Sequence, residues 1–427
     1  MTTIIPTAEP ESYLHTVENW ILSAVKGGRT SFSEILGSLP GVYPPIAFSS
    51  LQGLVSQENK LISQELLDHI EVEISREQEQ PIDTFHRIKL PIPHPLDYDW
   101  RFHDAAVRLL LDRCTALSHG NEMIVLLGTP SVLRYALEHR YPRRMLLLNA
   151  NRLITDSLAK VAPAGKVVLC DIAKDALPGV SSPVVVMDPP WYPESIQLFL
   201  WAACQLSTIG GYVLASFPPV GTRPNIEQER GEILDWAQQL GLTLLRVEES
   251  ALPYSSPPFE RNALKTEGFT NISSRWRRGD LIIFSHTSRV FRNRPCVPPF
   301  EGKWTEEVHS GIRLRMRPSS DQQFRDPLLE SIVPGDILPS VSRRDLRRKL
   351  VDVWTSGNRV FKCRGVNTLR IILRALATHS SPNHALSSFL KRELSDTERQ
   401  LISRSTRQIS ELVHLERKEI SLYGEGL

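Results

Sequence analysis

The sequence predicts an α/β fold whose core is a doubly wound, seven-stranded sheet spanning about residues 97–286. Two observations support this prediction. Seven short apolar runs have the length of buried strands, and several intervals between them, such as 131–139 and 193–206, carry apolar residues at helical spacing. Continuous apolar strands joined by helices indicate a mainly parallel sheet with both faces covered. The predicted strands are 123–128, 144–149, 166–171, 183–188, 211–217, 242–248 and 280–286.

Three further regions flank this core. Residues 1–80 show helical spacing and resemble a winged-helix unit, a fold that binds nucleic acid or mediates dimerisation. No basic run lies on the third predicted helix, which favours a homodimer or packing against a partner protein. Residues 81–96 are expected to be a linker, because their prolines fix the backbone in extended form. Residues 287–427 are expected to form an α-rich, basic accessory domain with a helical tail.

Composition is typical of an ordinary globular protein. Of the 427 residues, 41% are hydrophobic and 23% are charged, and this length suggests two or three domains. No apolar run approaches the roughly 20 residues of a transmembrane helix, and no signal-like segment opens the chain, so we expect a cytoplasmic protein without membrane contact. The five scattered cysteines form no C-x-x-C pair, so no disulfide framework and no metal site are predicted.

The net charge of +2 is unevenly distributed along the chain. Residues 287–427 hold about 25 Lys and Arg against about 16 Asp and Glu, a net charge of roughly +9 that leaves roughly −7 for residues 1–286. The runs "RLRMRP" and "SRRDLRRKL" suit contact with phosphate groups of nucleic acid, which requires cations and little specific geometry. The alternative is a solvated helix face or a protein-docking surface.

A motif with chemical meaning follows the fourth predicted strand. Doubly wound sheets bind ligands beyond the carboxyl ends of their strands, and here "VVVM" runs into Asp188, Pro189, Pro190 and Trp191. The Asp188 carboxylate and a proline carbonyl can accept both hydrogens of an amino group, while the prolines hold these acceptors in place. Trp191 can stack on a flat base or cover an alkylammonium group. The alternative is a strand-ending aspartate that caps the next helix, with Trp191 in the core.

This motif resembles the catalytic motif of amino-group methyltransferases that act on adenine N6 or cytosine N4. Over roughly residues 95–245 the chain also resembles branched-chain polyamine synthases (bis-aminopropyl spermidine synthases), which join a winged helix to a methyltransferase-like sheet. The shared features include a glycine-ended first strand, "DIAKDALPG" and "DPPWYPESIQLFL". The resemblance implies a methyltransferase-like domain that uses S-adenosylmethionine or its decarboxylated form. It also implies that Asp188 acts at the amine, and that Asp171 and Ile172 contact the cofactor.

The expected cofactor loop departs from these families. "GTPSV" at residues 128–132 stands where the polyamine synthases have glycine followed by aspartates, and Asn149 ends the second strand, where an acidic residue usually binds ribose hydroxyls. Gly128, Thr129 and Asn149 are the expected cofactor contacts, although an amide bonds hydroxyls less strongly than a carboxylate does. The missing carboxylates disfavour a polyamine acceptor more than they disfavour the transferase fold.

Four residues are the expected acceptor contacts: Asp99, Tyr192, Pro218 and Pro219. Asp99 lies just before a predicted helix, so its alternative role is that helix's N-cap. The alternative for Pro218 and Pro219 is a proline-stiffened loop. His94 and His103 lie nearby without metal-ligand spacing, and structural roles are expected for both.

Three functions therefore remain. The first is an S-adenosylmethionine-dependent transferase that alkylates an amine nitrogen, with N-methylation, for example of a nucleobase, narrowly favoured over aminopropyl transfer. A base within a duplex would first have to be flipped out. The second is a catalytically dead binding module of the same fold, for which "GTPSV" is the best argument. The third is a scaffold subunit of a larger assembly.

Overall fold

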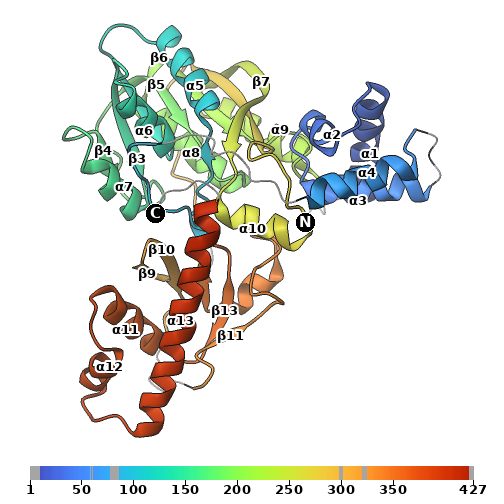
Figure 1. Ribbon diagram of the computed structural model, residues 1–427. Helices are drawn as coiled ribbons and strands as arrows, with labels where there is room; N and C mark the ends of the chain where they lie inside the picture. Colours follow the sequence, from blue (N-terminus) through green and yellow to red (C-terminus); the bar gives the residue numbers. More distant parts are fainter. Residues whose placement is uncertain are drawn as a thin grey trace, which may run out of the picture.

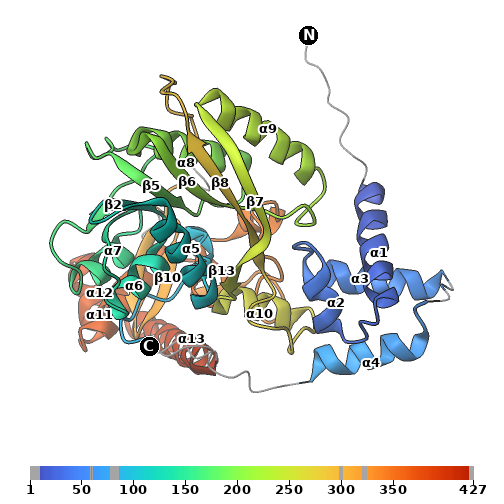
Figure 2. The same ribbon diagram turned by 90° about the horizontal axis from the view of Figure 1, so that it is seen from above.

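The structure is a computed structural model that describes residues 10–57, 59, 61–76, 86–297, 302–319 and 325–422. Within these ranges a central α/β unit is flanked by a helical N-terminal unit and by a C-terminal unit of strands and helices (Figure 1). The view from above shows the N-terminal helices beside α10 (Pro258–Thr266) of the central unit (Figure 2).

The central sheet has eight strands in the order β1-β7-β8-β6-β5-β2-β3-β4. Seven of them coincide with the predicted runs, which confirms the doubly wound α/β class, and the two-residue β1 adds an eighth at one edge. Strands β4, β3, β2, β5 and β6 are parallel, whereas β8 is antiparallel to both neighbours. The strands are β1 (Arg101–Phe102), β2 (Met123–Leu127), β3 (Arg144–Asn149), β4 (Val167–Leu169), β5 (Ser182–Met187), β6 (Ser207–Phe217), β7 (Leu242–Ser255) and β8 (Arg278–His286).

Five helices cover the two faces of this sheet, because successive side chains of a strand point to opposite faces. On β2, Ile124 and Leu126 pack in one apolar core with α5, α6 and α7, while Val125 and Leu127 pack in the other with α8 and α9. The helices are α5 (Asp104–Leu117), α6 (Pro130–Glu138), α7 (Arg152–Ala159), α8 (Pro193–Leu206) and α9 (Ile226–Gln239).

The order of strands reverses between β2 and β5. From β2 the chain continues outward to β3 and β4, whereas β5 and β6 lie on the other side. The Asp188 N–H donates to Leu127 O at 3.2 Å, and the Gly128 N–H donates to Leu148 O at 3.0 Å, so both strand ends share one rim. A crevice at such a reversal is the usual ligand site of doubly wound sheets. Gly128 and Asp188 therefore flank the expected crevice.

The N-terminal unit consists of four helices, α1 (Pro10–Lys26), α2 (Phe32–Ser38), α3 (Pro44–Ser56) and α4 (Gln64–Ser75). Ser31 and Glu34 start α2 with a capping box, which satisfies two otherwise free backbone N–H groups. The core of this unit also includes Leu264 and Trp276, so it is continuous with the central unit. The described part of residues 1–80 contains no strand that would form a wing, and the winged-helix assignment stays a prediction.

The C-terminal unit is richer in strands than its sequence suggested. Three helices, including the predicted helical tail, pack on a five-stranded antiparallel sheet of order β11-β13-β12-β10-β9 that the sequence analysis missed. These elements are β9 (Thr305–His309), β10 (Ile312–Met316), β11 (Leu329–Ser331), β12 (Val353–Thr355), β13 (Val360–Cys363), α11 (Val366–Ala377), α12 (Pro382–Leu390) and α13 (Asp396–Leu422). Two single turns of 3-10 helix, Pro95–Asp97 and Leu346–Leu350, complete the described elements.

A buried ion pair joins the C-terminal sheet to the central unit. Arg313 on β10 is fully buried and contacts Asp97 at 2.5 Å and Glu306 at 2.7 Å. Arg315, two residues along the same strand, also pairs with Asp97. Because a buried charge is costly unless it is paired, this cluster fixes the C-terminal unit next to the segment before β1.

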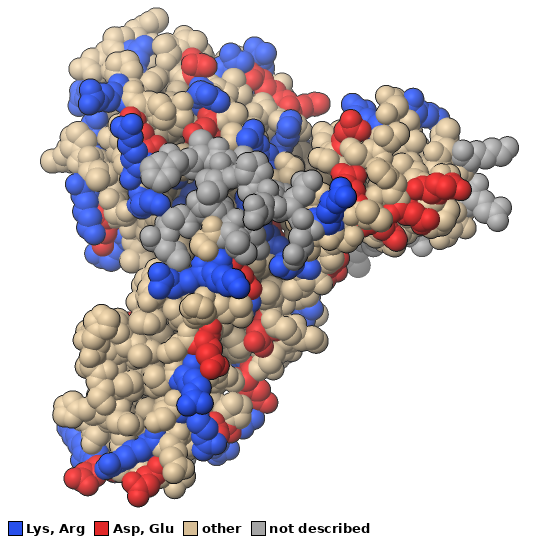
Figure 3. Space-filling view, viewed as in Figure 1, with Lys and Arg blue, Asp and Glu red and all other residues tan. Residues whose placement is uncertain are grey.

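The arginines of the basic runs mostly contact other residues of the protein. Arg343 pairs with Glu194 at 2.5 Å, Arg347 pairs with Asp345 at 2.6 Å, and Arg348 is buried. Lys and Arg side chains are interspersed with Asp and Glu on the face that Figure 3 shows, and they do not form one continuous basic stripe. Arg344, Arg347 and Lys349 are exposed, and phosphate binding by the C-terminal runs stays a prediction.

Candidate active site

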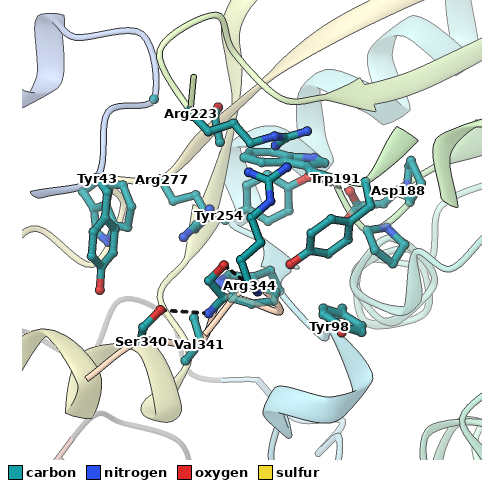
Figure 4. Close-up of a pocket in the computed structure, with 18 of the residues that line it drawn as sticks. Tyr43, Tyr98, Asp188, Trp191, Arg223, Tyr254, Arg277, Ser340, Val341 and Arg344 are labelled. Carbon is teal, nitrogen blue, oxygen red and sulfur yellow. Dashed lines mark hydrogen bonds between the residues drawn. The ribbon is translucent and has the colours of Figure 1, made fainter. Parts of the chain in front are cut away.

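A cavity of about 350 Å³ opens at the carboxyl end of β5, where the three units meet (Figure 4). Tyr43 comes from the N-terminal unit, Asp188 and Trp191 from the loop after β5, and residues 340–342 and 344 from the C-terminal unit. Aromatic side chains make up much of its wall. The described residues that line it are Gly41, Tyr43, Ile46, Tyr98, Trp100, Asp188, Pro189, Pro190, Trp191, Tyr192, Thr222, Arg223, Tyr254, Trp276, Arg277, Ser340, Val341, Ser342 and Arg344.

Asp188 lies in the wall of this cavity. Pro189 and Pro190 follow it and restrict the turn that leads into α8. The Asp188 carboxyl accepts a hydrogen bond from the Tyr254 hydroxyl at 2.6 Å, and the residue as a whole is partly exposed at the cavity wall. Burial raises the pKa of Asp188 from 3.8 to about 8, although the hydrogen bond from Tyr254 acts in the opposite direction. This carboxyl group therefore gains and loses its proton close to neutral pH.

A chain of hydrogen bonds fixes the orientation of Asp188. Trp191 Nε1 donates to Ser216 Oγ at 3.3 Å, and Ser216 Oγ lies 2.5 Å from Tyr254 Oη. Since the indole is only a donor and the Tyr254 hydrogen is used on Asp188, the Ser216 hydroxyl donates to Tyr254. Ser216 and Tyr254 are buried, with 1% and 2% of their surface exposed. Ser216 on β6 and Tyr254 on β7 thus connect the two ends of the DPPW motif, Trp191 and Asp188, by hydrogen bonds.

Arg277 lies among three tryptophans on the cavity wall. Its guanidinium carbon is 4.8 Å from the ring centroid of Trp276, 5.2 Å from that of Trp100 and 5.7 Å from that of Trp191. Arg277 Nε and Nη2 also donate to Glu260 Oε1 at 3.0 Å and 2.5 Å. A cation over aromatic faces at these distances is electrostatically favourable.

Tyr192 lines the cavity and connects it to the C-terminal unit. Its hydroxyl oxygen accepts a hydrogen bond from the Arg343 N–H at 3.2 Å, and the Arg343 guanidinium lies 4.0 Å from its ring centroid. The same guanidinium pairs with Glu194 in the first turn of α8. The segment 340–344 is therefore anchored directly beside the DPPW motif.

Gly128 and Thr129 occupy the other side of the strand reversal and do not line the described cavity. Gly128 has φ of +65°, and a Cβ there would lie 3.2 Å from Phe199 and 3.4 Å from Asp188 O. Thr129 precedes α6 without capping it, and its buried Oγ1 has no hydrogen-bond partner among the described residues. The close neighbours of Gly128 are thus other parts of the protein, and Thr129 is buried with 1% of its surface exposed.

Asn149 at the end of β3 is bonded within the protein. Its Oδ1 accepts from the Asn151 N–H at 2.7 Å, and Asn151 Nδ2 donates to Asp97 at 2.6 Å. Asp97 is also the partner of Arg313 and Arg315. The strand end that usually binds ribose hydroxyls is therefore connected to the C-terminal unit.

Asp171 and Ile172 follow β4, outside the described cavity. Asp171 accepts from the Ala173 N–H at 3.0 Å and pairs with Lys174 at 2.7 Å, so it stabilises its own turn. Ile172 is buried in the core under α8. Among the predicted cofactor contacts, Thr129 is the one whose buried side-chain oxygen has no hydrogen-bond partner in the described residues.

Asp99 is not the N-cap of the following helix, so that alternative is wrong. Both of its carboxyl oxygens bond to Arg101, at 2.7 Å and 3.2 Å, in a buried pair. The N-cap of α5 is His103, whose Nδ1 accepts from the Ala105 N–H at 3.1 Å. His94 similarly caps the turn at residues 95–97, so both histidines have the structural roles expected of them.

Pro218 and Pro219 are buried and do not line the described cavity. Pro219 packs against Gly41 of the N-terminal unit, and its carbonyl accepts from Thr222 Oγ1 at 2.7 Å. Thr222 and Arg223, a few residues further on, reach the cavity instead. The loop was expected to form a wall of the site, and its later residues do so.

Several residues of the cavity are absent from the sequence prediction. Tyr254 and Arg277 come from adjacent ends of β7 and β8, and Tyr43 comes from the N-terminal unit. Tyr254 follows a predicted strand and precedes Ser-Ser-Pro-Pro, which is a recognisable strand-end signal. Tyr43 and residues 340–344 carry no such signal, because they reach the site only through packing between units.

Among the described ranges, no group of three or more His, Cys, Asp or Glu side chains could hold a metal ion. In the same ranges, none of the helices has the length and apolar character needed to span a bilayer.

No protein-family model and no curated protein sequence matches the chain. Solved structures do show similarity. A branched-chain polyamine synthase from Thermus thermophilus, in complex with N4-aminopropylspermidine and 5′-methylthioadenosine, is 12% identical with a TM-score of 0.47 and covers 68% of this chain and 97% of its own. A putative RNA methyltransferase from Pyrococcus horikoshii is 12% identical with a TM-score of 0.33, covering 52% and 99%.

A third solved structure is a 16S rRNA N2 G1207 methyltransferase from Thermus thermophilus in complex with AdoMet and guanosine. It is 15% identical with a TM-score of 0.28 and covers 60% of this chain and 57% of its own. The assignment of the α/β class here depends on the strand order of this chain's own sheet.

Proposed function

We propose that this protein is an S-adenosylmethionine-dependent transferase that alkylates an amine nitrogen, with N-methylation narrowly favoured. One observation supports the proposal above all. The Asp188 carboxyl, held by Tyr254 at the rim of a doubly wound sheet, opens into a cavity lined by aromatic side chains. An amino group in this cavity would meet a fixed acceptor, and a flat ring that carries it would meet aromatic surfaces.

The residues have distinct roles in the proposed reaction. Asp188 and a carbonyl of the following prolines accept the two amine hydrogens, which frees the nitrogen lone pair from the attached ring. The nitrogen gains a carbon substituent and loses one proton, which the Asp188 carboxylate accepts. Tyr254 and Ser216 keep the carboxylate oriented, so no reorganisation is needed as charge develops. Trp191 and the neighbouring rings exclude water from the reacting atoms.

The donor would lie on the Gly128 side of the strand reversal. Its proposed contacts are Gly128, Thr129, Asn149, Asp171 and Ile172. S-adenosylmethionine, when bound, supplies a carbon activated by the adjacent sulfonium. The main-chain atoms at Gly128 and Asp188 are neighbours, which supports transfer between the two sides.

Aminopropyl transfer from decarboxylated S-adenosylmethionine is the alternative reaction. A polyamine carries several ammonium groups, which need carboxylates as partners. Asp188 is the sole acidic side chain among the described residues that line the cavity, and the three lining arginines, Arg223, Arg277 and Arg344, each pair with a glutamate outside the lining. A wall with a single carboxyl group favours a neutral amine, such as the amino group of a nucleobase.

A catalytically dead binding protein is the second candidate. It is favoured by the Asn151–Asp97 contact, which uses the end of β3 to hold the C-terminal unit in place of a ribose. A scaffold role in a larger assembly is a variant of this candidate.

Two measurements test the proposal. Calorimetry with S-adenosylmethionine, its decarboxylated form and S-adenosylhomocysteine should show binding and identify the donor. Label transfer to nucleic acids and polyamines should occur with the wild type and be lost, by about 100-fold or more, in Asp188→Ala. Binding of none of the three compounds would favour the dead module, and equal transfer by both proteins would remove the role of Asp188.

A further inference from the structure

The three tryptophans around Arg277 form a cage of the kind that binds cations. Trp100, Trp191 and Trp276 present their rings within 5.7 Å of the guanidinium carbon, a range in which aromatic faces attract Lys, Arg or alkylammonium groups. Proteins use such cages to recognise ammonium ligands. Here a side chain of the protein itself occupies the cage, at the wall of the cavity that holds Asp188 (Figure 4).

Glu260 holds Arg277 in this place. The carboxylate on α10 is fully buried, and its Oε1 accepts from both Nε and Nη2 of Arg277. Its other oxygen, Oε2, has no hydrogen-bond partner among the described residues. If Arg277 left the cage, Glu260 would remain as an unpaired buried charge, which is strongly unfavourable. The guanidinium is therefore a permanent part of the cavity wall.

A fixed guanidinium affects which acceptors can enter. An ammonium group in the cavity would lie close to the guanidinium of Arg277, and Asp188 is the one carboxyl among the described residues of the lining. The other two arginines of the wall, Arg223 and Arg344, both pair with Glu229. Like charges repel strongly where water is partly excluded. A neutral planar amine has no such cost, and it gains from stacking on the rings or on the guanidinium plane.

We infer that Arg277 is a specificity determinant: it excludes alkylammonium acceptors and selects a neutral, planar amine such as the exocyclic amino group of a nucleobase. The inference rests on the proposed function for the identity of the site, and it assigns the choice of acceptor to one residue. Arg277 acts by occupying the cation cage, and Glu260 acts by holding it there.

Equilibrium binding of cytidine and spermidine, measured by calorimetry without any donor, tests this assignment. Wild-type protein should bind spermidine at least about tenfold more weakly than cytidine, because of charge repulsion in the cavity. Arg277→Met should reverse this preference, since the cage and the Glu260 carboxylate become available to an ammonium group. The double variant Arg277→Met with Glu260→Gln should lose the gain, and Arg277→Lys should keep the wild-type preference.

Either of two results would overturn the inference. One is wild-type binding of spermidine as tight as that of cytidine, a result that does not depend on any variant folding. The other is spermidine binding by Arg277→Met that does not exceed that of the double variant, with both folded by circular dichroism. The binding measurements involve no transfer reaction. A negative binding result would therefore reject the role of Arg277 without testing Asp188, and a negative transfer assay would reject the proposed function without changing the binding result.

Discussion

At the scale of single residues, Asp188 combines burial with a fixed hydrogen bond. Burial raises its pKa to about 8, while the Tyr254 bond favours the ionised form and holds one oxygen in place. A proton acceptor works best when its pKa lies near the working pH. The same burial that suits Asp188 for this role makes its charge costly to the folded protein.

The pH dependence of transfer should follow the ionisation of Asp188. Transfer requires the carboxylate, so kcat/KM should rise with pH and level off above about pH 8. Tyr254→Phe removes a hydrogen bond that lowers the pKa of Asp188, so the midpoint should move to higher pH and the rate near pH 7 should fall about tenfold or more. Tyr212→Phe, outside the cavity lining, is the control, and an unchanged midpoint in Tyr254→Phe would contradict the assignment.

Asp188→Asn should stabilise the protein in a pH-dependent way. The carboxyl titrates near 3.9 in an unfolded chain and at about 8 in the folded protein. Stability is therefore lost progressively as pH rises from about 4 to about 8, where the unfolded state ionises first. The Tm advantage of Asp188→Asn should be smallest at pH 4 and largest above pH 8, in thermal unfolding followed by circular dichroism. An advantage of equal size at both pH values would refute this account.

At the scale of elements, the turn between β12 and β13 is closed by a side chain from α13. Glu416 is fully buried, bonds to Thr355 and accepts from the Gly357 N–H at 3.1 Å. Burial raises the pKa of Glu416 to about 7, against the effect of the nearby Arg359. The long C-terminal helix thus depends on a turn with no room for a side chain.

Gly357→Ala should destabilise this junction. A Cβ at Gly357 would lie 2.7 Å from the Glu416 carboxyl carbon, closer than real contacts allow, so the buried Glu416 side chain must move away from Thr355 and Gly357 or the turn must shift. The expected loss is about 1–3 kcal/mol in the free energy of unfolding, measured by urea denaturation. Gly179→Ala is the matched control, because no atom lies within 4 Å of its added Cβ, and it should change stability by less than about 0.5 kcal/mol.

At the scale of the whole molecule, the cavity exists because three units are held together. The N-terminal unit contributes Tyr43, the C-terminal unit contributes residues 340–342 and 344, and the central unit contributes Asp188. The Asp97–Arg313 pair connects the C-terminal unit to the segment before β1, and the Arg343–Glu194 pair connects it to α8. Among the described residues of 287–427, four arginines form ion pairs with the central unit, namely Arg313, Arg315, Arg343 and Arg344.

Arg313→Met should loosen the C-terminal unit. Arg313 is fully buried, so its loss leaves the carboxylates of Asp97 and Glu306 with fewer partners, at a cost on the order of 3 kcal/mol. Thermal unfolding and limited proteolysis within residues 302–422 should both report the change. Arg364→Met breaks an exposed pair with Glu330 and should cost less than about 1 kcal/mol. Similar losses in both variants would show that the buried pair has no special role.

The apolar pattern alone was sufficient to predict the central unit. Seven strands and the helices between them follow from runs such as Met123–Leu127 and from the spacing within Pro193–Leu206, because burial on both faces forces a local, readable pattern. The five strands of the C-terminal sheet were missed, because they are short and carry charged residues such as Arg313 and Arg315 in a buried cluster. Charged residues in a sequence normally indicate an exposed segment, whereas here ion pairs formed in the tertiary structure allow them to be buried.

The sequence by itself determined where chemistry could occur, since Asp188 and its prolines must follow a buried strand and reach the rim of the sheet. Only the tertiary structure decided what surrounds them. Tyr254, Arg277 and residues 340–344 are distant in sequence and meet Asp188 through strand order and packing between units. The physical reason is that local propensity acts over a few residues, whereas the polarity and charge of a cavity depend on contacts between segments far apart in the chain.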